Sequence, residues 1–147
     1  MKTLMAKPAE VERKWYIVDA TDMPLGRLAS QVADILHGKN KVDYTPNVDA
    51  GDHVIVINSD NVVLTGKKLS QKKLRWHTGY VGGLKEVDYK TLMANNSDKA
   101  VIQAVKGMLP KNSLGRKMLT RLRVFKGAEH DHIAQQTISI ELKEARK

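Results

Sequence analysis

The residues of this sequence that could do chemistry are mainly cations, and they are concentrated in one stretch. Residues 67–126 contain 15 Lys and Arg but only 3 Asp and Glu, whereas residues 1–66 contain 7 against 9 and residues 127–147 contain 3 against 4. The net charge of +9 therefore originates in this one stretch. A basic, solvated face is one interpretation, but solvation alone gives no reason to segregate charge, so the pattern favours a surface that binds a polyanion.

One group of cations follows Pro110, where residues 113–125 are expected to form an amphipathic helix capped by Asn112 or Ser113. Cations four residues apart on a helix are about 6 Å apart along its axis, close to the spacing of neighbouring phosphates on one strand. No acid lies between Lys99 and Lys126, whereas ordinary solvated helices mix both signs. A solvated amphipathic helix remains the alternative. We predict phosphate contacts here for Lys111, Arg116, Lys117, Arg121, Arg123 and Lys126, and a sugar or base contact for Asn112.

A second group of cations is followed by aromatic residues and a glycine-rich loop at residues 78–83. Cations suit phosphates, exposed rings can stack on splayed bases, and glycines allow close approach of a backbone, so this combination is typical of folded RNA as a ligand. Trp76 could equally belong to the core. We predict phosphate contacts for Lys67, Lys68, Lys72, Lys73 and Arg75, and sugar or base contacts for His77 and Tyr80.

Motifs for catalysis or cofactor binding are missing, so we expect no enzyme activity, no cofactor and no small-molecule substrate. The turn at residues 20–26 lacks GxGxxG, and Asp22 within it would repel a pyrophosphate. The chain contains no P-loop and no GxSxG elbow. It has no cysteine, which excludes disulfides and thiolate chemistry. His130 and His132 lack further ligands at a convincing spacing, so we interpret them as loop residues and expect no metal.

No segment of the sequence is typical of membrane insertion or secretion. The first thirteen residues have no apolar core, and the longest apolar runs, such as residues 54–57, are far below the 20 or so residues that span a bilayer. We therefore expect a cytoplasmic protein with no membrane partner.

The first half of the chain is expected to form the scaffold that positions the cations. Residues 15–18 and 53–58 are rich in apolar and β-branched types, which predicts buried strands, and residues 61–65 are expected to form a third short strand. Between the first two strands, residues 24–36 predict an amphipathic helix with Asp22 as its cap and Gly38 as its stop. The order strand, helix, strand implies a parallel pair with a right-handed crossover.

The second half is expected to alternate short helices with loops. We predict helices over residues 67–74, 88–95 and 98–109, a break at residues 95–97, an extended segment over residues 74–77 and a last strand over residues 137–142. The chain length suits one domain. We divide that domain, residues 1–147, into a sheet scaffold (14–66), a basic RNA-binding portion (67–126) and a tail (133–147).

Several motifs, in one order and without a gap, resemble the bacterial type of large-subunit ribosomal protein thirteen. They lie at residues 15–20 (WYIVDA), 24–29 (PLGRLA), 52–58 (DHVIVIN), 77–80 (HTGY), 105–110 (VKGMLP), 115–116 (GR) and 122–127 (LRVFKG). The resemblance covers residues 14–132. It departs at Val81, where many family members have proline after the tyrosine.

This resemblance implies an α/β fold with three layers, α/β/α, around a four-stranded, mainly parallel sheet, with basic helical and loop extensions. It further implies a structural constituent of the large ribosomal subunit in the cytoplasmic ribosome. Such a protein would bind large-subunit rRNA and neighbouring large-subunit ribosomal proteins, would help early assembly of the subunit and would take part in translation. Two alternatives stay open, namely a regulatory RNA-binding protein that acts off the ribosome, for example on its own messenger, and a nucleotide-dependent enzyme on the same scaffold.

Overall fold

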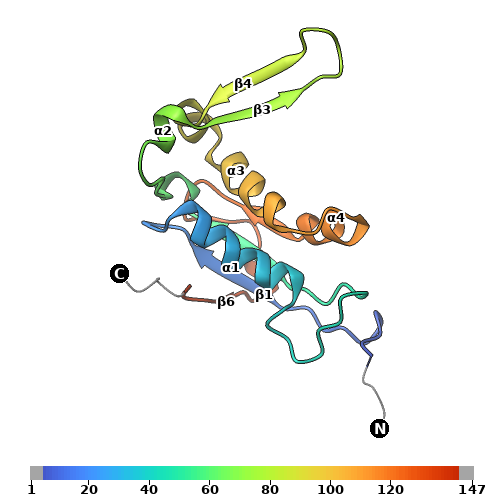
Figure 1. Cartoon of the computed structure of the whole chain (residues 1–147). Coiled ribbons are helices and arrows are strands. Elements are labelled where there is room, and N and C mark those ends of the chain that lie inside the picture. Colours follow the sequence, from blue (N-terminus) through green and yellow to red (C-terminus); the bar gives the residue numbers. More distant parts are fainter. Residues whose placement is uncertain (1–4, 143–147) are drawn as a thin grey trace.

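A four-stranded parallel sheet in the order β5–β2–β1–β6 forms the centre of the computed structural model, which describes residues 5–142 (Figure 1). The strands are β1 (Trp15–Asp19), β2 (His53–Ile57), β5 (Leu122–Val124) and β6 (Ile138–Ser139). Val54, Ile55 and Val56 of β2 are fully buried, as expected for a central strand covered on both faces. The expected parallel sheet is confirmed.

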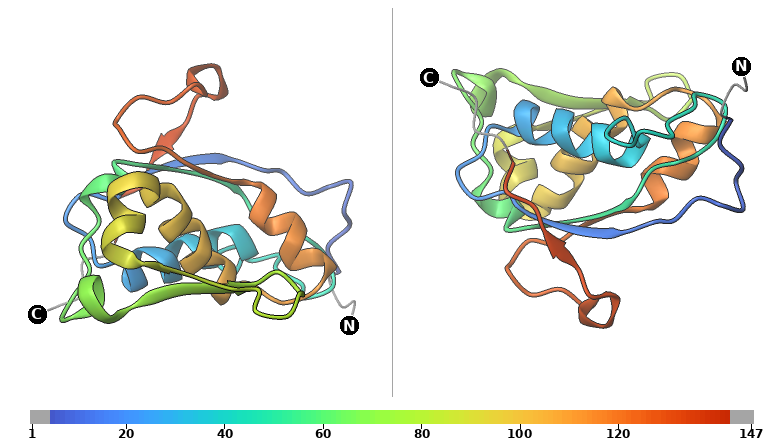
Figure 2. Two further views of the ribbon diagram at one scale, coloured as in Figure 1. Left: turned by 90° about the horizontal axis from the view of Figure 1, so that it is seen from above. Right: turned by 90° about the horizontal axis from the view of Figure 1, so that it is seen from below.

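Helices flank this sheet in a three-layer α/β/α arrangement. The helices α1 (Leu25–His37), α3 (Tyr89–Met108) and α4 (Ser113–Thr120) cover one face, because the crossovers from β1 to β2 and from β2 to β5 progress in the same direction across the sheet. The segment with the 3-10 helix η2 (Ile133–Gln135) lies on the other side (Figure 2). The apolar core lies between the sheet and the three α-helices, and includes Val18, Leu28, Val54, Val101 and Met118.

The helix α1 confirms the amphipathic pattern of its sequence, although its start differs from the prediction. Gly38 ends the helix with φ of +83°, and a Cβ there would lie only 2.9 Å from the Ala50 carbonyl carbon, so both the conformation and the space require glycine. Asp22 is not the cap. Pro24 occupies that position without a side-chain hydrogen bond, because Asp22 itself adopts a left-handed conformation in the turn before it.

An antiparallel hairpin projects from the body and was only half predicted. The short helix α2 (Lys68–Gln71) and the strand β3 (Lys73–His77) agree with the expected helix and extended segment. The partner strand β4 (Leu84–Asp88) was not predicted, because the adjacent charged residues Lys85 and Glu86 interrupt the alternation of apolar and polar residues that is typical of a strand. The strand expected over residues 61–65 is wrong. The chain forms the 3-10 helix η1 (Ser59–Asn61) and then a single bridge from Val63 to Pro24.

The two helices expected over residues 88–109 form one element, α3, with a kink. Asn96 has φ of −142° and ψ of 63°, which places a break where the asparagines predicted one. Asp98 does not cap a new helix. Instead the break is fixed by Ser97, which is fully buried and shares a hydrogen bond with Ser59 of η1 at 2.8 Å.

The helix expected to continue to Phe125 ends at Thr120, and this correction changes the site. Asn112 caps α4 as predicted, since its side-chain oxygen accepts a hydrogen bond from the Gly115 backbone N–H at 2.8 Å. After Arg121 the chain becomes extended and forms β5, because the apolar Leu122 and the β-branched Val124 pair with β2. The last strand is confirmed as β6, which pairs with β1, so part of the predicted tail belongs to the sheet.

Candidate nucleic-acid interface

Five exposed cations on the part of α3 after its kink, on α4 and on the loop between these helices have no partner among the described residues. Within residues 5–142, no ion pair, hydrogen bond or ring contact occupies the side-chain nitrogens of Lys99, Lys106, Lys111, Arg116 or Lys117. We call these five residues the cation row. Figure 1 shows that α3 leads directly into α4 along one border of the body, so the row follows two consecutive helices. Unpaired cations in such a row can bind the phosphates of a polyanion.

Two members of the cation row were missed in the sequence. Lys99 and Lys106 are seven residues apart on α3, which places both on one side of the helix at about 10 Å along the axis. That spacing was a usable signal. The prediction instead favoured the cations after Pro110, where their density is higher.

Arg121 was predicted to contact phosphate, but the structure buries it. Its side chain is 8 % exposed and forms an ion pair with Asp49, which is 14 % exposed. The guanidinium donates from Nη2 to Asp49 Oδ1 at 2.6 Å and to the Leu36 carbonyl oxygen at 3.0 Å, and from Nη1 to Asp49 Oδ2. Burial alone would raise the pKa of Asp49, but the hydrogen bonds and charge of Arg121 outweigh burial and lower that pKa. Arg121 is therefore a scaffold residue and does not face a ligand.

Arg123 and Lys126 are exposed, but both side chains donate hydrogen bonds within the protein, so they are not part of the cation row. Arg123 is in β5, and its side chain lies on the opposite face of the sheet from that of Leu122, which packs in the helix-covered core. Its Nη1 donates to the Thr120 carbonyl oxygen at 2.9 Å. Lys126 donates to the Asn95 carbonyl oxygen at the kink of α3. A helix that continued to residue 125 would have placed Arg123 on the same side as Arg116.

The cations at the base of the hairpin are partly neutralised within the hairpin itself. Glu86 on β4 accepts hydrogen bonds from Lys73 Nζ at 3.1 Å and from Arg75 Nε at 3.0 Å, because the register places Arg75 directly opposite Glu86. The hydrogen bond from Lys73 lowers the pKa of Glu86, and the pKa of Lys73 rises correspondingly. All three side chains are exposed enough for a ligand to compete for them.

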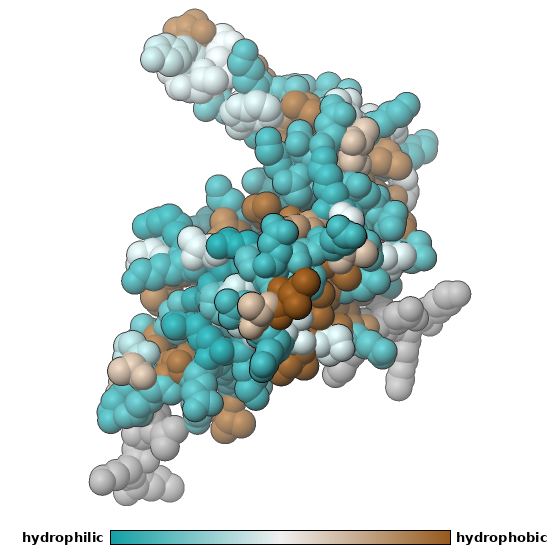
Figure 3. All heavy atoms as spheres, turned by 180° about the vertical axis from the view of Figure 1, so that it is seen from behind, coloured by the Kyte–Doolittle hydropathy of each residue, from teal (hydrophilic) through white to brown (hydrophobic). Residues whose placement is uncertain are grey.

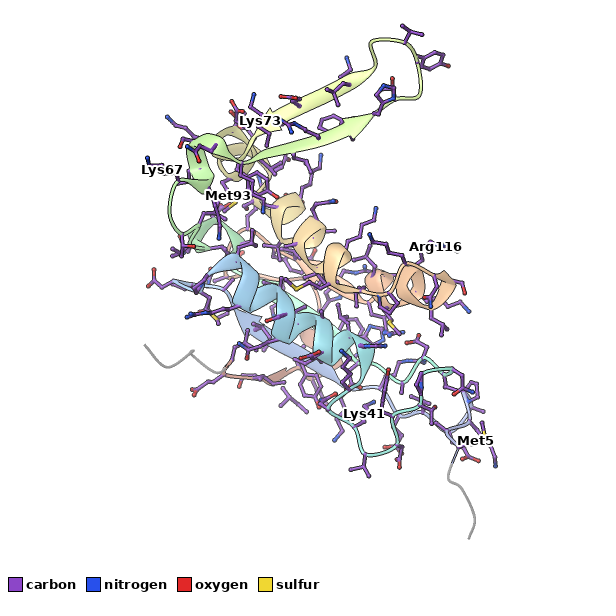
Figure 4. All side chains as sticks on the ribbon, viewed as in Figure 1. Met5, Lys41, Lys67, Lys73, Met93 and Arg116 are labelled. Atoms are coloured by element: carbon purple, nitrogen blue, oxygen red, sulfur yellow. The ribbon has the colours of Figure 1, made fainter. Side chains whose placement is uncertain are left out.

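The lysines around α2 lie next to a cleft of about 430 Å³ between α1, α2 and α3. Lys68 and Lys72 line this cleft, and Lys72 Nζ lies 4.6 Å from the centre of the Tyr89 ring. Lys67, directly before α2, is exposed. Figure 4 shows Lys67 and Lys73 together at the base of the hairpin and Arg116 on α4, at the far end of the row of helices.

The aromatic residues of the hairpin and the residues predicted to contact sugars or bases differ in exposure and in hydrogen bonding. Tyr80 is 80 % exposed at the hairpin tip, and Trp76 on β3 is 48 % exposed, which decides against a core position for Trp76. His77 Nδ1 accepts a hydrogen bond from the Gly79 backbone N–H at 2.9 Å. The side-chain oxygen of Asn112 accepts one hydrogen bond in capping α4, and the side-chain NH2 is the donor that remains for a sugar or base contact.

Three histidines, His53, His130 and His132, pack with aromatic rings on the other face of the sheet. Trp15 stacks on His53 with ring centres 4.1 Å apart and planes 7° apart, and His132 lies 5.3 Å from Trp15 and 5.9 Å from Phe125. Burial first, and then the neighbouring arginines, lower the pKa of His53. Across residues 5–142 no three potential metal-ligating side chains come together. The same residues include no helix long and apolar enough to cross a membrane.

Comparison with known proteins identifies the class to which this basic α/β chain belongs. Residues 13–131 match the family described as ribosomal protein L13. The chain is 61% identical over 142 residues to a protein of Ruminiclostridium cellulolyticum, covering 97% of this chain and 99% of that one. It is 59% identical over 143 residues to a protein of Finegoldia magna, covering 97% and 100%, and 57% identical over 135 residues to one of Clostridioides difficile, covering 92% and 94%.

All three relatives are named large ribosomal subunit protein uL13, a structural protein of ribosomes and not an enzyme. The chain belongs to the ribosomal protein L13 family. The resemblance found in the sequence motifs is thereby confirmed over nearly the whole chain.

Proposed function

We propose that this protein is a structural constituent of the large ribosomal subunit that binds large-subunit rRNA and helps early assembly of the subunit. Family membership supports the first part, since the relatives are constituents of that subunit. The unpaired cation row supports the second part, because phosphate contacts supply most of the affinity of proteins that bind nucleic acids with few base contacts.

The proposed binding residues differ from the sequence prediction in three ways. The cation row is the principal phosphate-binding surface, and Lys67, Lys68 and Lys72 extend it toward the hairpin. Lys73 and Arg75 contribute once a phosphate displaces Glu86 as their ion-pair partner. Arg123 and Lys126 contact RNA from the other side of the body, and Arg121 contributes only through the fold.

A salt titration of rRNA binding tests this proposal. The logarithm of the binding constant should fall linearly with the logarithm of salt concentration, and each lost phosphate contact should reduce that slope by about 0.7–0.9. The variant Arg116→Gln/Lys117→Gln should therefore reduce the slope by about 1.4–1.8. Lys39→Gln serves as the control, since Lys39 is paired with Asp34 at the end of α1. A flat titration of the wild-type protein would refute the phosphate contacts.

Order-of-addition reconstitution tests the role in assembly. Subunits assembled with the Arg116→Gln/Lys117→Gln variant should accumulate as slower-sedimenting precursors, whereas the Lys39→Gln control should give complete subunits. If the wild-type protein sediments mainly apart from ribosomes, it acts as a free RNA-binding regulator and the structural role is wrong.

A further inference from the structure

The β3–β4 hairpin differs from the cation row in its charge. From Trp76 through the tip to Leu84 the sequence has no Asp, Glu, Lys or Arg. Nearer the base, Lys73 and Arg75 are paired with Glu86 on the same hairpin, and Lys85, which has no ion pair among the described residues, lies opposite Trp76 in the register. A phosphate has little to bind at the tip, yet Trp76 and Tyr80 expose 48 % and 80 % of their surfaces there. Exposed aromatic rings without charge suit a flat, uncharged ligand.

The tip is fixed in shape before any ligand arrives. Thr78 N–H donates to the Gly83 carbonyl oxygen at 3.0 Å, and Gly83 N–H donates to the Tyr80 carbonyl oxygen at 2.9 Å. A Cβ on Gly83 would lie 2.1 Å from Thr78 Oγ1, so the turn closes tightly around this glycine. A loop that is already ordered loses little conformational entropy on binding.

The hydrogen bond at His77 also sets the chemistry of the tip. Because Nδ1 accepts from the Gly79 N–H, the neutral ring has its proton on Nε2. The Nε2–H of the exposed His77 can donate to the edge of a nucleobase, while the exposed rings of Trp76 and Tyr80 can stack on the face of a base.

One face of the hairpin looks toward the helices. Leu74 and Val87 are opposite each other in the register and pack against the core, and Trp76 lies two residues beyond Leu74 on the same face. The hairpin then stands away from the body, with a hollow beneath it (Figure 3). Figure 1 shows the hairpin above α3 and α4, so the face of β3 that carries Trp76 is turned toward the helices of the cation row.

We propose that the hairpin is a nucleobase-binding finger, in which Trp76 and Tyr80 stack on unpaired bases of large-subunit rRNA. This inference rests on the proposed function and adds the class of nucleotide that the hairpin recognises. Single-stranded loops and bulges are the parts of RNA whose bases are free to stack on aromatic side chains. The finger contributes affinity that does not depend on counterion release, in contrast to the cation row.

Salt titrations of rRNA binding with the full-length protein separate the two contributions. Trp76→Ala and Tyr80→Ala should each weaken binding by roughly 5- to 100-fold, with the salt slope unchanged. Trp76→Phe and Tyr80→Phe, which retain a ring, should recover most of the affinity. Val42→Ala is the control, because Val42 is a fully exposed apolar residue outside the hairpin and outside the helices.

Fluorescence gives an independent measurement. The chain has two tryptophans, so Trp15→Phe leaves Trp76 as the single reporter. The emission of Trp76 should be quenched on addition of rRNA. In footprinting, the wild-type protein should protect unpaired nucleotides, and Tyr80→Ala should abolish this protection.

Wild-type affinity in both alanine variants, with no quenching, would overturn the finger and indicate that the tip contacts a neighbouring protein instead. A reduced salt slope in Tyr80→Ala would also overturn it. Both results are distinguishable from failure of the proposed function, which would appear as flat salt dependence of the wild-type protein.

Discussion

Replacing Arg121 should damage the fold of this protein and leave its intrinsic contacts with RNA unchanged. The guanidinium connects the C-terminal end of α1, through the Leu36 carbonyl oxygen, with Asp49 of the loop before β2. Arg121 itself lies between α4 and β5, so one side chain joins three separate parts of the chain. Arg121→Met retains much of the apolar stem but removes the charge.

The expected size of this effect follows from burial. Arg121 is 7 % exposed as a residue, and its loss leaves the carboxylate of Asp49 without its principal partner. Removing one member of a buried pair costs about 3–5 kcal/mol, a large part of the roughly 5–15 kcal/mol that stabilises a typical domain. For a domain of this length the midpoint of thermal unfolding should fall by roughly 6–20 °C.

Urea and thermal unfolding monitored by circular dichroism measure this loss. Arg116→Met is the matched control, since Arg116 is exposed and unpaired among the described residues and should cost less than about 0.5 kcal/mol. The double variant Arg121→Met/Asp49→Leu should recover part of the loss, because it also removes the unpaired carboxylate. Wild-type stability in Arg121→Met, together with a reduced salt slope of RNA binding, would refute the structural role and restore the phosphate contact.

Three further predictions concern other parts of the structure. Gly51→Ala should prevent stable folding, because its Cβ would lie 1.7 Å from the Leu36 carbonyl oxygen, whereas Gly127→Ala, with nothing within 4 Å, should unfold like the wild type. Glu86→Gln should tighten rRNA binding and steepen its salt dependence by freeing Arg75 and leaving Lys73 only its longer ion pair with Asp88; no change relative to Glu129→Gln would argue against phosphate at the hairpin base. Because the pKa of His53 is lower in the folded state, the unfolded chain takes up the proton first, so the free energy of unfolding should fall as pH drops below about 6.5. His53→Phe retains a ring beside Trp15 and should reduce that fall in urea titrations at pH 7 and 5; an unchanged fall would exclude His53 as its source.

The strands and helices that depend on a local pattern were predictable from the sequence. The run at residues 53–58 is apolar and β-branched throughout, and the helix at residues 24–36 repeats its apolar residues with helical period, so β2 and α1 appear where expected. The errors lie where tertiary pairing overrides a local pattern. Leu122 and Val124 fit an amphipathic helix as well as a strand, and the neighbouring β2 decides between the two. The strand β4 depends likewise on its pairing with β3.

The same limit applies to the binding surface. The position of the cations along the chain predicted that a basic surface exists, but it could not tell which cations find an internal partner. Arg121 lies 72 residues from Asp49 in the sequence, and only the fold brings the two together. By contrast, Glu86 lies within the same hairpin as Arg75, so its effect would have followed from a correct prediction of β4.

The structure explains why acids and cations are separated along the sequence. Two acids of the first half, the partly buried Asp49 and the buried Asp52, form ion pairs with Arg121 and Lys41, and Asp52 also accepts a hydrogen bond from the Lys14 backbone N–H at 2.9 Å. These carboxylates fasten loops onto the sheet and are not available to neutralise the cation row. The row consequently repels itself in the free protein, and phosphates relieve this repulsion when RNA binds. The proposed binding of RNA to the folded state should therefore stabilise the scaffold that these acids hold together. Acids that were dispersed among Lys99–Lys117 would weaken both effects at once, because they would pair with the cations before RNA could.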